Sequence, residues 1–177
     1  VEITVEAICP STISSLPYTE SFESDFGDWI QVTTDDYDWT RNSGTTSSTT
    51  TGPSSASDGS YYIYTEASVS TYNTSFILNG PCFNLNCVTP VFTFDYHMYG
   101  STMGSLDLEV EATPGSGTWV SVWSMSGDQG DVWHSASVDL SAYSGTTIKL
   151  RFNGVIGSSY YSDMAVDNLE LFCDCTP

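Results

Sequence analysis

Basic residues are nearly absent from this chain. Its 177 residues include 3 Lys and Arg against 22 Asp and Glu, which gives a formal net charge of −19 at pH 7. A chain this acidic repels phosphate groups and anionic lipid headgroups at long range, so neither nucleic acid nor an anionic membrane surface is an expected partner. Long apolar runs are absent too, because no stretch approaches the roughly 20 residues of a membrane-spanning helix. The sequence therefore predicts no membrane insertion.

Sequence motifs of catalysis are also missing. The chain has 2 histidines, His97 and His134, and neither lies in an HExxH motif or beside a second histidine at ligand spacing. The stretch GSTMG places Thr102 where a nucleophile elbow has serine. No P-loop or dinucleotide fingerprint occurs. The 22 acids leave a glycosidase carboxylate pair open, but most of them fall on polar strand faces or in turns. We therefore predict a non-catalytic protein.

The chain does contain alternating strand sequence. It is 40% hydrophobic and 14% aromatic, which is enough to build a core. In residues 91–98 apolar and polar side chains alternate, and the same period of two recurs in residues 106–110 and 148–152. Short strands separated by Gly, Ser, Pro and Asn clusters, with no sustained helical period, predict an all-β fold. We expect a two-sheet antiparallel β-sandwich of the jelly-roll kind.

The segment from Ser43 to Ser60 interrupts this strand pattern. It is low in apolar residues and rich in Ser, Thr and Gly. We expect a long surface loop here, and loops of that length inside a compact domain are usually functional or mobile. The two interpretations, a flexible insertion and a loop that contacts a ligand, stay open at this point.

Five cysteines lie beside turns or near the chain ends: Cys9, Cys82, Cys87, Cys173 and Cys175. Their spacing fits disulfides better than zinc, which usually needs two close pairs or paired histidines. We expect a local Cys82–Cys87 bridge, a bridge from Cys9 to Cys173 or Cys175 that ties the chain ends together, and one leftover thiol. Disulfides persist in oxidising compartments, so the sequence predicts a secreted or cell-surface protein.

Several acids fall where strands end, and they are candidate ligands for a structural calcium ion: Glu23, Asp25, Asp58 and Asp167. Calcium takes oxygen ligands from loops that the fold brings together. In a jelly roll the first and last strands commonly run side by side, which would bring Glu23 close to Asp167. Asp167 shares the parity of Ala165 and Leu169 and is expected to face inward. A buried carboxylate needs either a cation or backbone N–H donors, and both alternatives stay open.

Four aromatic residues fall in loops or near strand ends: Tyr72, Trp119, Tyr160 and Tyr161. An exposed aromatic ring can stack on a sugar or anchor a protein partner. We therefore take these four as the candidate ligand-binding residues.

Seven stretches carry a family resemblance: FESDFGDW, DDYDWTR, YYIYTEAS, FDYHMYGSTMGSL, SGDQGDVW, FNGV and AVDNLEL. In order and spacing they resemble the MAM domain, the extracellular module of meprins, neuropilins and receptor tyrosine phosphatases. The resemblance implies a non-catalytic jelly roll used in adhesion, dimerisation or ligand capture, with a cation site onto which Glu23, Asp58 and Asp167 map. The family cysteines that flank the first stretch are replaced here by Glu20 and Gly27, so the family bridge between them is absent.

The tail CDCTP and the Ser/Thr-rich composition resemble those of modules in secreted multidomain proteins of bacteria. We expect the domain to span residues 15–173, with a linker at 174–177. Residues 1–14 are either a linker or the closing strand of a preceding similar domain, because residues 5–9 match residues 169–173 in type. The predicted function is polysaccharide binding, with neutral glycans favoured over strongly anionic ones. The alternative is a protein adhesion or dimerisation module accessory to a secreted peptidase or other enzyme.

Overall fold

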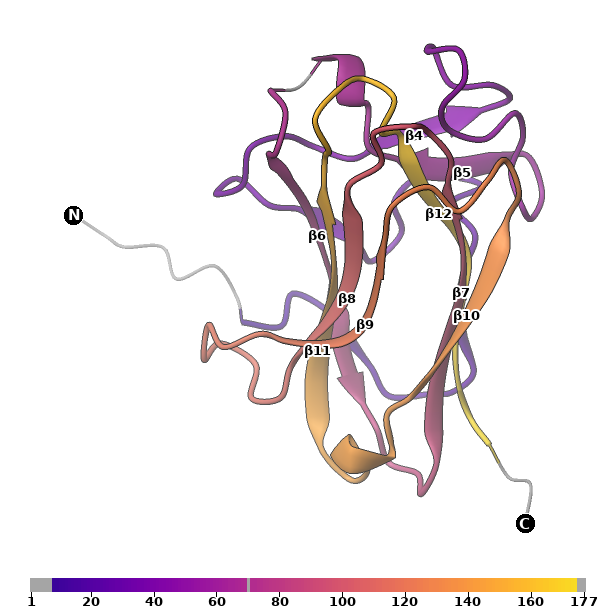
Figure 1. The fold of residues 1–177 in the computed structure, drawn as a ribbon. Helices are drawn as coiled ribbons and strands as arrows, with labels where there is room; N and C mark the ends of the chain where they lie inside the picture. Colours follow the sequence, from indigo (N-terminus) through magenta and orange to yellow (C-terminus); the bar gives the residue numbers. More distant parts are fainter. Residues whose placement is uncertain (1–7, 70, 175–177) are drawn as a thin grey trace.

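Two β-sheets pack face to face in the computed structural model, which describes residues 8–69 and 71–174 (Figure 1). Antiparallel pairing dominates both sheets, and the one parallel pair among the described residues joins β1 to β6. The described helices are two short 3-10 turns, η1 (Ala67–Val69) and η2 (Ser141–Tyr143). Neither is long and apolar enough to cross a membrane. The prediction of an all-β sandwich is confirmed.

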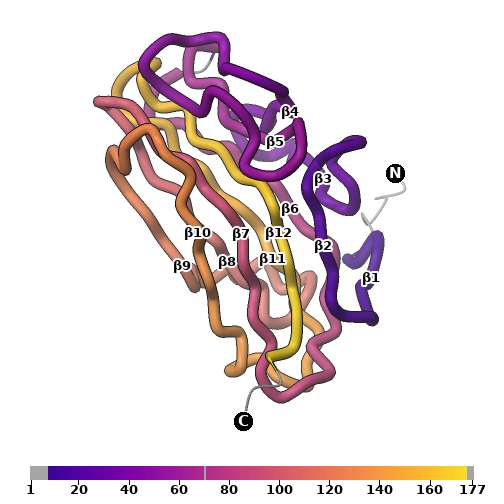
Figure 2. The backbone as a smooth tube through the Cα atoms, turned by 90° about the vertical axis from the view of Figure 1, so that its right-hand side faces the viewer, coloured from indigo at the N-terminus to yellow at the C-terminus, as the bar shows by residue number. Residues whose placement is uncertain are grey.

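Each sheet has six strands among the described residues. The first sheet contains, in spatial order, β1 (Thr12–Ile13), β6 (Ser75–Asn84), β11 (Thr147–Val155), β8 (Ser105–Glu111) and β9 (Val120–Ser126), and β3 (Ile30–Gln31) also pairs with β6. The second contains β10 (His134–Asp139), β7 (Pro90–Met98), β12 (Met164–Cys173), β5 (Tyr61–Tyr64) and β4 (Thr40–Ser43), and β2 (Tyr18–Glu20) also pairs with β12. Figure 2 shows β1, β2 and β3 together on one side of the sandwich and β9 and β10 on the other.

An aromatic cluster fills the space between the sheets. Phe152 on β11 lies at its centre, with its ring centroid 5.2 Å from that of Trp29 and 5.0 Å from that of Phe94. The alternation in residues 91–98 and 148–152 places these rings inward, because side chains one residue apart point to opposite sheet faces. Packed rings of this size each bury a large apolar area and contribute strongly to the stability of a core.

A β-bulge in β12 reverses the predicted direction of Asp167. The register with β7 shifts between Asp167 and Glu170, and Asn168 adopts φ +51°. Val166 and Leu169 both face the core, so the parity changes between them. Asp167 is fully buried, as predicted, but on the outer face of the second sheet rather than toward the core. The inward prediction was wrong because a bulge inserts an extra residue and breaks the period of two.

The disulfide pairing differs from the prediction. Cys9 bridges to Cys82 and Cys87 bridges to Cys173, with Cα–Cα distances of 5.5 and 6.1 Å. A Cys82–Cys87 bridge does not form because β6 continues to Asn84 and carries Cys82 away from the turn that holds Cys87. The parallel pairing of β1 with β6 brings Cys9 to Cys82 instead. The fifth cysteine, Cys175, lies outside the described residues.

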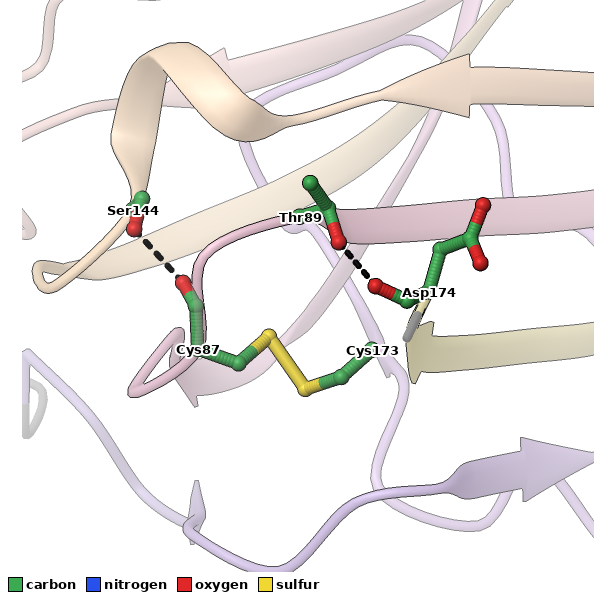
Figure 3. Close-up of a disulfide and its surroundings, with 5 residues drawn as sticks. All are labelled: Cys87, Thr89, Ser144, Cys173 and Asp174. Carbon is green, nitrogen blue, oxygen red and sulfur yellow. Dashed lines mark hydrogen bonds between the residues drawn. A yellow bond between two sulfur atoms is a disulfide. The ribbon is translucent and has the colours of Figure 1, made fainter. Parts of the chain in front are cut away.

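Each bridge ties one end of the described chain to the sandwich: Cys9 to Cys82 on β6, and Cys173 to Cys87 in the turn between β6 and β7. In Figure 3 Cys87 stands between two chain segments: Ser144 donates a hydrogen bond to its carbonyl oxygen at 2.5 Å, and its sulfur is bonded to Cys173. Thr89 donates to the carbonyl oxygen of Asp174 beside it. Because β1 and Cys9 join this framework, the sandwich includes residues before Ser15. Whether residues 1–7 belong to a preceding domain, and whether 175–177 form a linker, lies outside the described residues.

Glu20 and Gly27 lie together, as the lost family bridge requires. A Cβ atom on Gly27, which has φ +57°, would lie 1.8 Å from Oε2 of Glu20. The Glu20 carboxylate also accepts a hydrogen bond from the Phe22 N–H at 2.7 Å. The Glu20 carboxylate therefore fills the space beside Gly27, and the positive φ of Gly27 strains any other residue at this position.

Candidate functional site

Three of the four candidate aromatic residues gather at one end of the sandwich. The rings of Tyr160 and Tyr161 have centroids 4.0 Å apart, and the Tyr160 hydroxyl donates a hydrogen bond to the Tyr161 hydroxyl. That hydrogen bond raises the pKa of Tyr160, and the nearby Tyr72 adds to the effect. Tyr72 and Tyr160 are 45% and 40% exposed, which is unusual for side chains of this size. We call Tyr72, Tyr160 and Tyr161 the tyrosine cluster.

Two connections between strands hold the tyrosine cluster in place. The Asn73 N–H donates to the carbonyl oxygen of Ile156, and the Ile156 N–H donates back to that of Thr74, both at 3.0 Å. The turn that carries Tyr72 is thereby fixed against the loop that carries Tyr160 and Tyr161. A Cβ on Gly157 would lie 1.8 Å from the carbonyl oxygen of Thr102, so that loop approaches the GSTMG turn more closely than any larger residue allows. Reciprocal backbone bonds make this a pre-ordered site.

Trp119 lies elsewhere. The Arg151 guanidinium sits 4.2 Å from its ring centroid, and Arg151 also pairs with Glu109. These residues belong to the outer face of the first sheet. The structure therefore brings Tyr72, Tyr160 and Tyr161 together and leaves Trp119 apart from them.

An acidic groove lies beside the tyrosine cluster, and it was not predicted from the sequence. It has a volume of about 420 Å³, and its lining includes Asp35, Asp36, Tyr37 and Asp38. The hydroxyls of Tyr37 and Thr71 lie 3.4 Å apart, which connects the groove to the turn that carries Tyr72. The DDYDW run is the sequence signal that marks this place, although nothing in its spacing shows that it lines a groove.

Backbone N–H groups of β6 anchor the acidic groove. Asp35 accepts a hydrogen bond from Ile77 N–H at 2.5 Å, and Asp36 accepts one from Ser75 N–H at 2.8 Å. Partial burial raises the pKa of Asp35, against the lowering effect of the Ile77 bond. The loop of residues 31–38 is therefore tied to the same strand that leads away from Tyr72.

The predicted calcium ligands surround one turn, residues 57–61. Glu23 accepts hydrogen bonds from the N–H groups of Ser60 and Tyr61 at 2.8 and 2.7 Å. Asp167 accepts from Ser57 and Asp58 N–H groups, both at 2.9 Å. Burial raises the pKa of Asp167 to about 6, although these bonds favour its charged form. The first and last strands thus bring Glu23 and Asp167 to the same turn, as expected, and each carboxylate is satisfied by backbone N–H donors.

The other acids near this turn do not complete a cage of carboxylates. Asp25 bonds to Gly27 N–H at 2.7 Å and has no contact with Asp167. Asp95, which was not predicted, lies directly across from Asp167 in the pairing of β7 with β12 and accepts a hydrogen bond from the Ser57 hydroxyl at 2.6 Å. Within residues 8–69 and 71–174, no three His, Cys, Asp or Glu side chains converge closely enough to hold an ion together. As they are arranged here, the residues do not form a calcium cage.

The segment from Ser43 to Ser60 packs onto the outer face of the second sheet. Its residues 46 and 51–53 are buried, and the Trp133 indole donates to the carbonyl oxygen of Ser55 at 2.9 Å. Beneath it a small apolar cluster forms from Tyr62, Tyr64 and Ala165. The segment lies at the surface, as expected for a long surface loop, but it is not free of the sheet, because Ala56 packs on this second cluster and residues 46 and 51–53 are buried.

Two buried acids hold this segment. Thr51 Oγ1 accepts a hydrogen bond from the Asp163 N–H at 2.9 Å, and Ser47 donates to the Glu66 carboxylate. Burial, together with the nearby charge of Glu66, raises the pKa of Asp163 to about 7, although a hydrogen bond from the Ala67 N–H opposes the shift. Burial also opposes the ionisation of Glu66, but hydrogen bonds from Ser47, Ser68 and Tyr64 outweigh it and lower the pKa of Glu66.

The raised pKa of Asp163 predicts that the stability of the domain depends on pH. Its folded pKa of about 7 exceeds its ordinary value of 3.8, so the folded protein binds more protons between these values and the free energy of unfolding falls as pH rises from about 4 to about 7. Glu66 contributes in the opposite sense, losing stability as pH falls through its lowered pKa. Denaturant unfolding should show that the free energy of unfolding decreases less between pH 5 and pH 8 for Asp163→Asn than for the wild type. Equal decreases in the two proteins would contradict this assignment.

Two of the stretches that carry the family resemblance meet at the end of β7. The His97 imidazole lies 3.2 Å from the carboxylate of Asp131, and the Gln129 N–H donates to the carbonyl oxygen of Met98 at 2.7 Å. Burial lowers the pKa of His97, which Asp131 partly offsets. DYHMYG and SGDQGDVW are therefore one structural unit, in which His97 fastens the loop that carries Asp131.

Comparisons with known proteins agree with this architecture. A family model described as "MAM domain, meprin/A5/mu" matches residues 21–176. The human MAM domain-containing glycosylphosphatidylinositol anchor protein 1 is 34% identical over 151 residues, which are 81% of this chain and 16% of that protein. This chain thus spans about a sixth of the length of such relatives. They include chicken, human, rat and mouse proteins, and they do not support the bacterial variety of the domain.

Solved structures of similar fold come from other proteins. The K1 cleaved adhesin domain of Lys-gingipain from Porphyromonas gingivalis superposes with a TM-score of 0.65 at 14% identity, over 90% of this chain and 99% of that one. A family 61 carbohydrate-binding module in complex with β-1,4-galactotriose has a TM-score of 0.59 at 16% identity, over 87% of this chain and 94% of that one. At these identities the likeness establishes a shared sandwich fold.

Proposed function

Because the chain belongs to the MAM domain family, we propose that it is a non-catalytic module that binds a neutral polysaccharide through the tyrosine cluster. MAM domains are extracellular modules, so the chain acts outside the cell, as its cysteines predict. The observation that carries the proposal is the gathering of Tyr72, Tyr160 and Tyr161 at one pre-ordered, exposed end of the sandwich.

The chemistry of the site supports a sugar ligand. Exposed aromatic faces stack on the C–H faces of pyranose rings, and their hydroxyls exchange hydrogen bonds with sugar hydroxyls. The adjacent carboxylates of Asp35, Asp36 and Asp38 are further hydrogen-bond acceptors. A net charge of −19 favours a neutral glycan over an anionic one. Structural neighbours of similar fold include a module solved with β-1,4-galactotriose, which is consistent with this choice.

Retention on polysaccharide tests the proposal. Affinity electrophoresis through gels containing galactan, xylan, glucan, or a sulfated or uronate-rich polymer should slow the protein in at least one neutral gel and in none of the charged ones. Unchanged mobility in every gel would overturn the proposal. Retention by the sulfated polymer alone would contradict the preference for neutral chains.

A protein-interaction module is the second candidate. The edge strand β9 carries no charged residue from Val120 to Ser126, and Val120 is 53% exposed. An uncharged, unpaired strand edge can accept a strand from another chain. This candidate, an adhesion or dimerisation module accessory to a secreted peptidase or other enzyme, predicts concentration-dependent association in sedimentation velocity, whereas the leading proposal predicts a monomer.

Calcium remains a proposal for the turn at residues 57–61. Asp167 is fully buried with Asp95 opposite it, and Asp58 reinforces the rise in its pKa. Neither of the two ion pairs among the described residues involves Asp167, and an ion would have to take the place of the Ser57 and Asp58 N–H groups that satisfy this carboxylate in the present arrangement. Calcium at 100 times its Kd should raise the Tm by about 5–10 °C over the protein in chelator. Asp167→Asn should remove that difference in Tm. Equal Tm values for the wild type with and without calcium would contradict the proposal of a structural calcium ion.

A further inference from the structure

A second groove lies next to the acidic groove. It has a volume of about 280 Å³ and is lined by Pro10, Ile30, Thr33, Thr34, Asn79 and Lys149, among others. We call it the Lys149 groove. It lies where β6 changes register against β11, between the segments of β6 that pair with β3 and with β1. The Cys9–Cys82 bridge immediately precedes Pro10 and fixes that wall.

Within the described part of the chain, no hydrogen bond, ion pair or ring contact holds the Lys149 side chain, in contrast to Arg41 and Arg151. Arg41 donates to the carbonyl oxygens of Phe22 and Glu23, and Arg151 is held by Glu109 and Trp119. Neither ion pair among the described residues involves Lys149.

The residue opposite Lys149 does not neutralise it. Glu111 lies across from Lys149 in the pairing of β8 with β11, but its carboxylate accepts a hydrogen bond from the Gly117 N–H at 2.7 Å instead. The Lys149 ammonium therefore has three hydrogen-bond donors to offer at the groove.

Asn79 supplies the complementary group. Its Oδ1 atom is buried and has no hydrogen-bond partner among the described residues. A buried acceptor without a donor destabilises a fold, so such a group calls for an explanation. Beside it Ile30 is 45% exposed and presents an apolar surface. A donor, an acceptor and an apolar face around one groove match the hydroxyls and the C–H face of a sugar.

The Lys149 groove is continuous with the proposed site. It shares Gln31, Val32 and Thr33 with the acidic groove. The acidic groove in turn includes Tyr37, whose hydroxyl lies 3.4 Å from that of Thr71, next to Tyr72. Lining residues therefore run along residues 31–38 to Lys149, and the contact of Tyr37 with Thr71 links this run to the turn that carries Tyr72.

We propose that the tyrosine cluster, the acidic groove and the Lys149 groove form one track for a linear neutral polysaccharide, with Lys149 and Asn79 binding the hydroxyls of its far end. The inference rests on the proposed function and adds to it that the ligand lies along the domain as an extended chain. The three aspartates in the middle of the track disfavour an anionic chain, so Lys149 donates to sugar oxygens and not to a carboxylate.

Chain length tests the track. Isothermal titration calorimetry uses the mono- to hexasaccharides of β-1,4-galactan or of xylan, depending on which polysaccharide the domain binds. The affinity should rise by at least about tenfold from the short to the long oligomers. Lys149→Met should weaken hexasaccharide binding at least about tenfold, as expected for the loss of one hydrogen bond from a charged donor. It should leave the affinity for the disaccharide unchanged, and Lys149→Arg should restore much of the loss.

Asn79→Leu separates a binding role from a structural one. Replacing an unpartnered buried acceptor with an apolar group of similar size should leave the Tm equal or higher while lowering the hexasaccharide affinity. A lower Tm with unchanged affinity would make Asn79 a structural residue and overturn its role.

The possible failures are distinguishable. No binding of any oligomer overturns the proposed function. Binding that is independent of chain length, and unchanged in Lys149→Met, overturns the track alone. Binding of oligogalacturonate in preference to galacto-oligosaccharides overturns the claim that the chain is neutral.

Discussion

Replacing both Tyr160 and Tyr161 with alanine is expected to abolish measurable binding of neutral polysaccharide. Aromatic residues at the centre of an interface commonly contribute 2 kcal/mol or more each, which corresponds to about 30-fold per ring. The two rings lie 4.0 Å apart and present one continuous surface, so the losses should combine to several hundred-fold. Tyr72→Ala alone should cost about 30-fold, because its ring stands on the neighbouring turn.

A control distinguishes this result from a general loss of structure. Tyr160 is 40% exposed and packs on no core residue, so the Tm of Tyr160→Ala should match that of the wild type. Trp119→Ala removes a larger ring from the outer face of the first sheet and should leave glycan affinity unchanged. Equal losses from Trp119→Ala and Tyr160→Ala would place Trp119 in the binding site and contradict the assignment.

Replacing Phe152 with alanine should destabilise the domain by about 3–5 kcal/mol. The fully buried ring lies within 5.0–6.4 Å of four others, those of Trp29, Trp39, Phe92 and Phe94. Its removal therefore leaves a cavity and also breaks several aromatic pairs. Urea unfolding at pH 7 measures the loss directly.

The same substitution at Phe172 is the matched control. Phe172 lies on β12 but is only half-buried and outside the core cluster. Its replacement should cost well under half as much as the loss at Phe152. A comparable loss at the two positions would mean that the core is not organised around Phe152.

Period-two alternation was sufficient to predict the central strands. Residues 91–98, 106–110 and 148–152 form β7, β8 and β11 with the expected faces inward, because one face of each strand is buried against the opposite sheet. The same rule failed on β12, where the bulge after Asp167 depends on contacts with β7 and leaves no local signature. It also missed the apolar cluster of Tyr62, Tyr64 and Ala165, which only a distant segment covers.

The candidate site was predictable in part. Their position in loops or near strand ends identified Tyr72, Tyr160 and Tyr161, but their proximity follows from backbone bonds between two separate connections. Trp119 carried the same local signal, and the cation–π contact with Arg151 that separates it from the others depends on strand pairing. Cysteine pairing failed for the same reason, because it depends on which strand lies beside β6 rather than on separation along the chain.

NMR titration of the isotopically labelled domain with a neutral oligosaccharide tests the central claim most directly. The account predicts that amide shifts concentrate in residues 71–74 and 156–163, extend along residues 31–38 to Lys149 as the oligosaccharide lengthens, and disappear with Tyr160→Ala/Tyr161→Ala. Shifts that leave out residues 71–74 and 156–163, or no shifts with any neutral oligosaccharide, would contradict it.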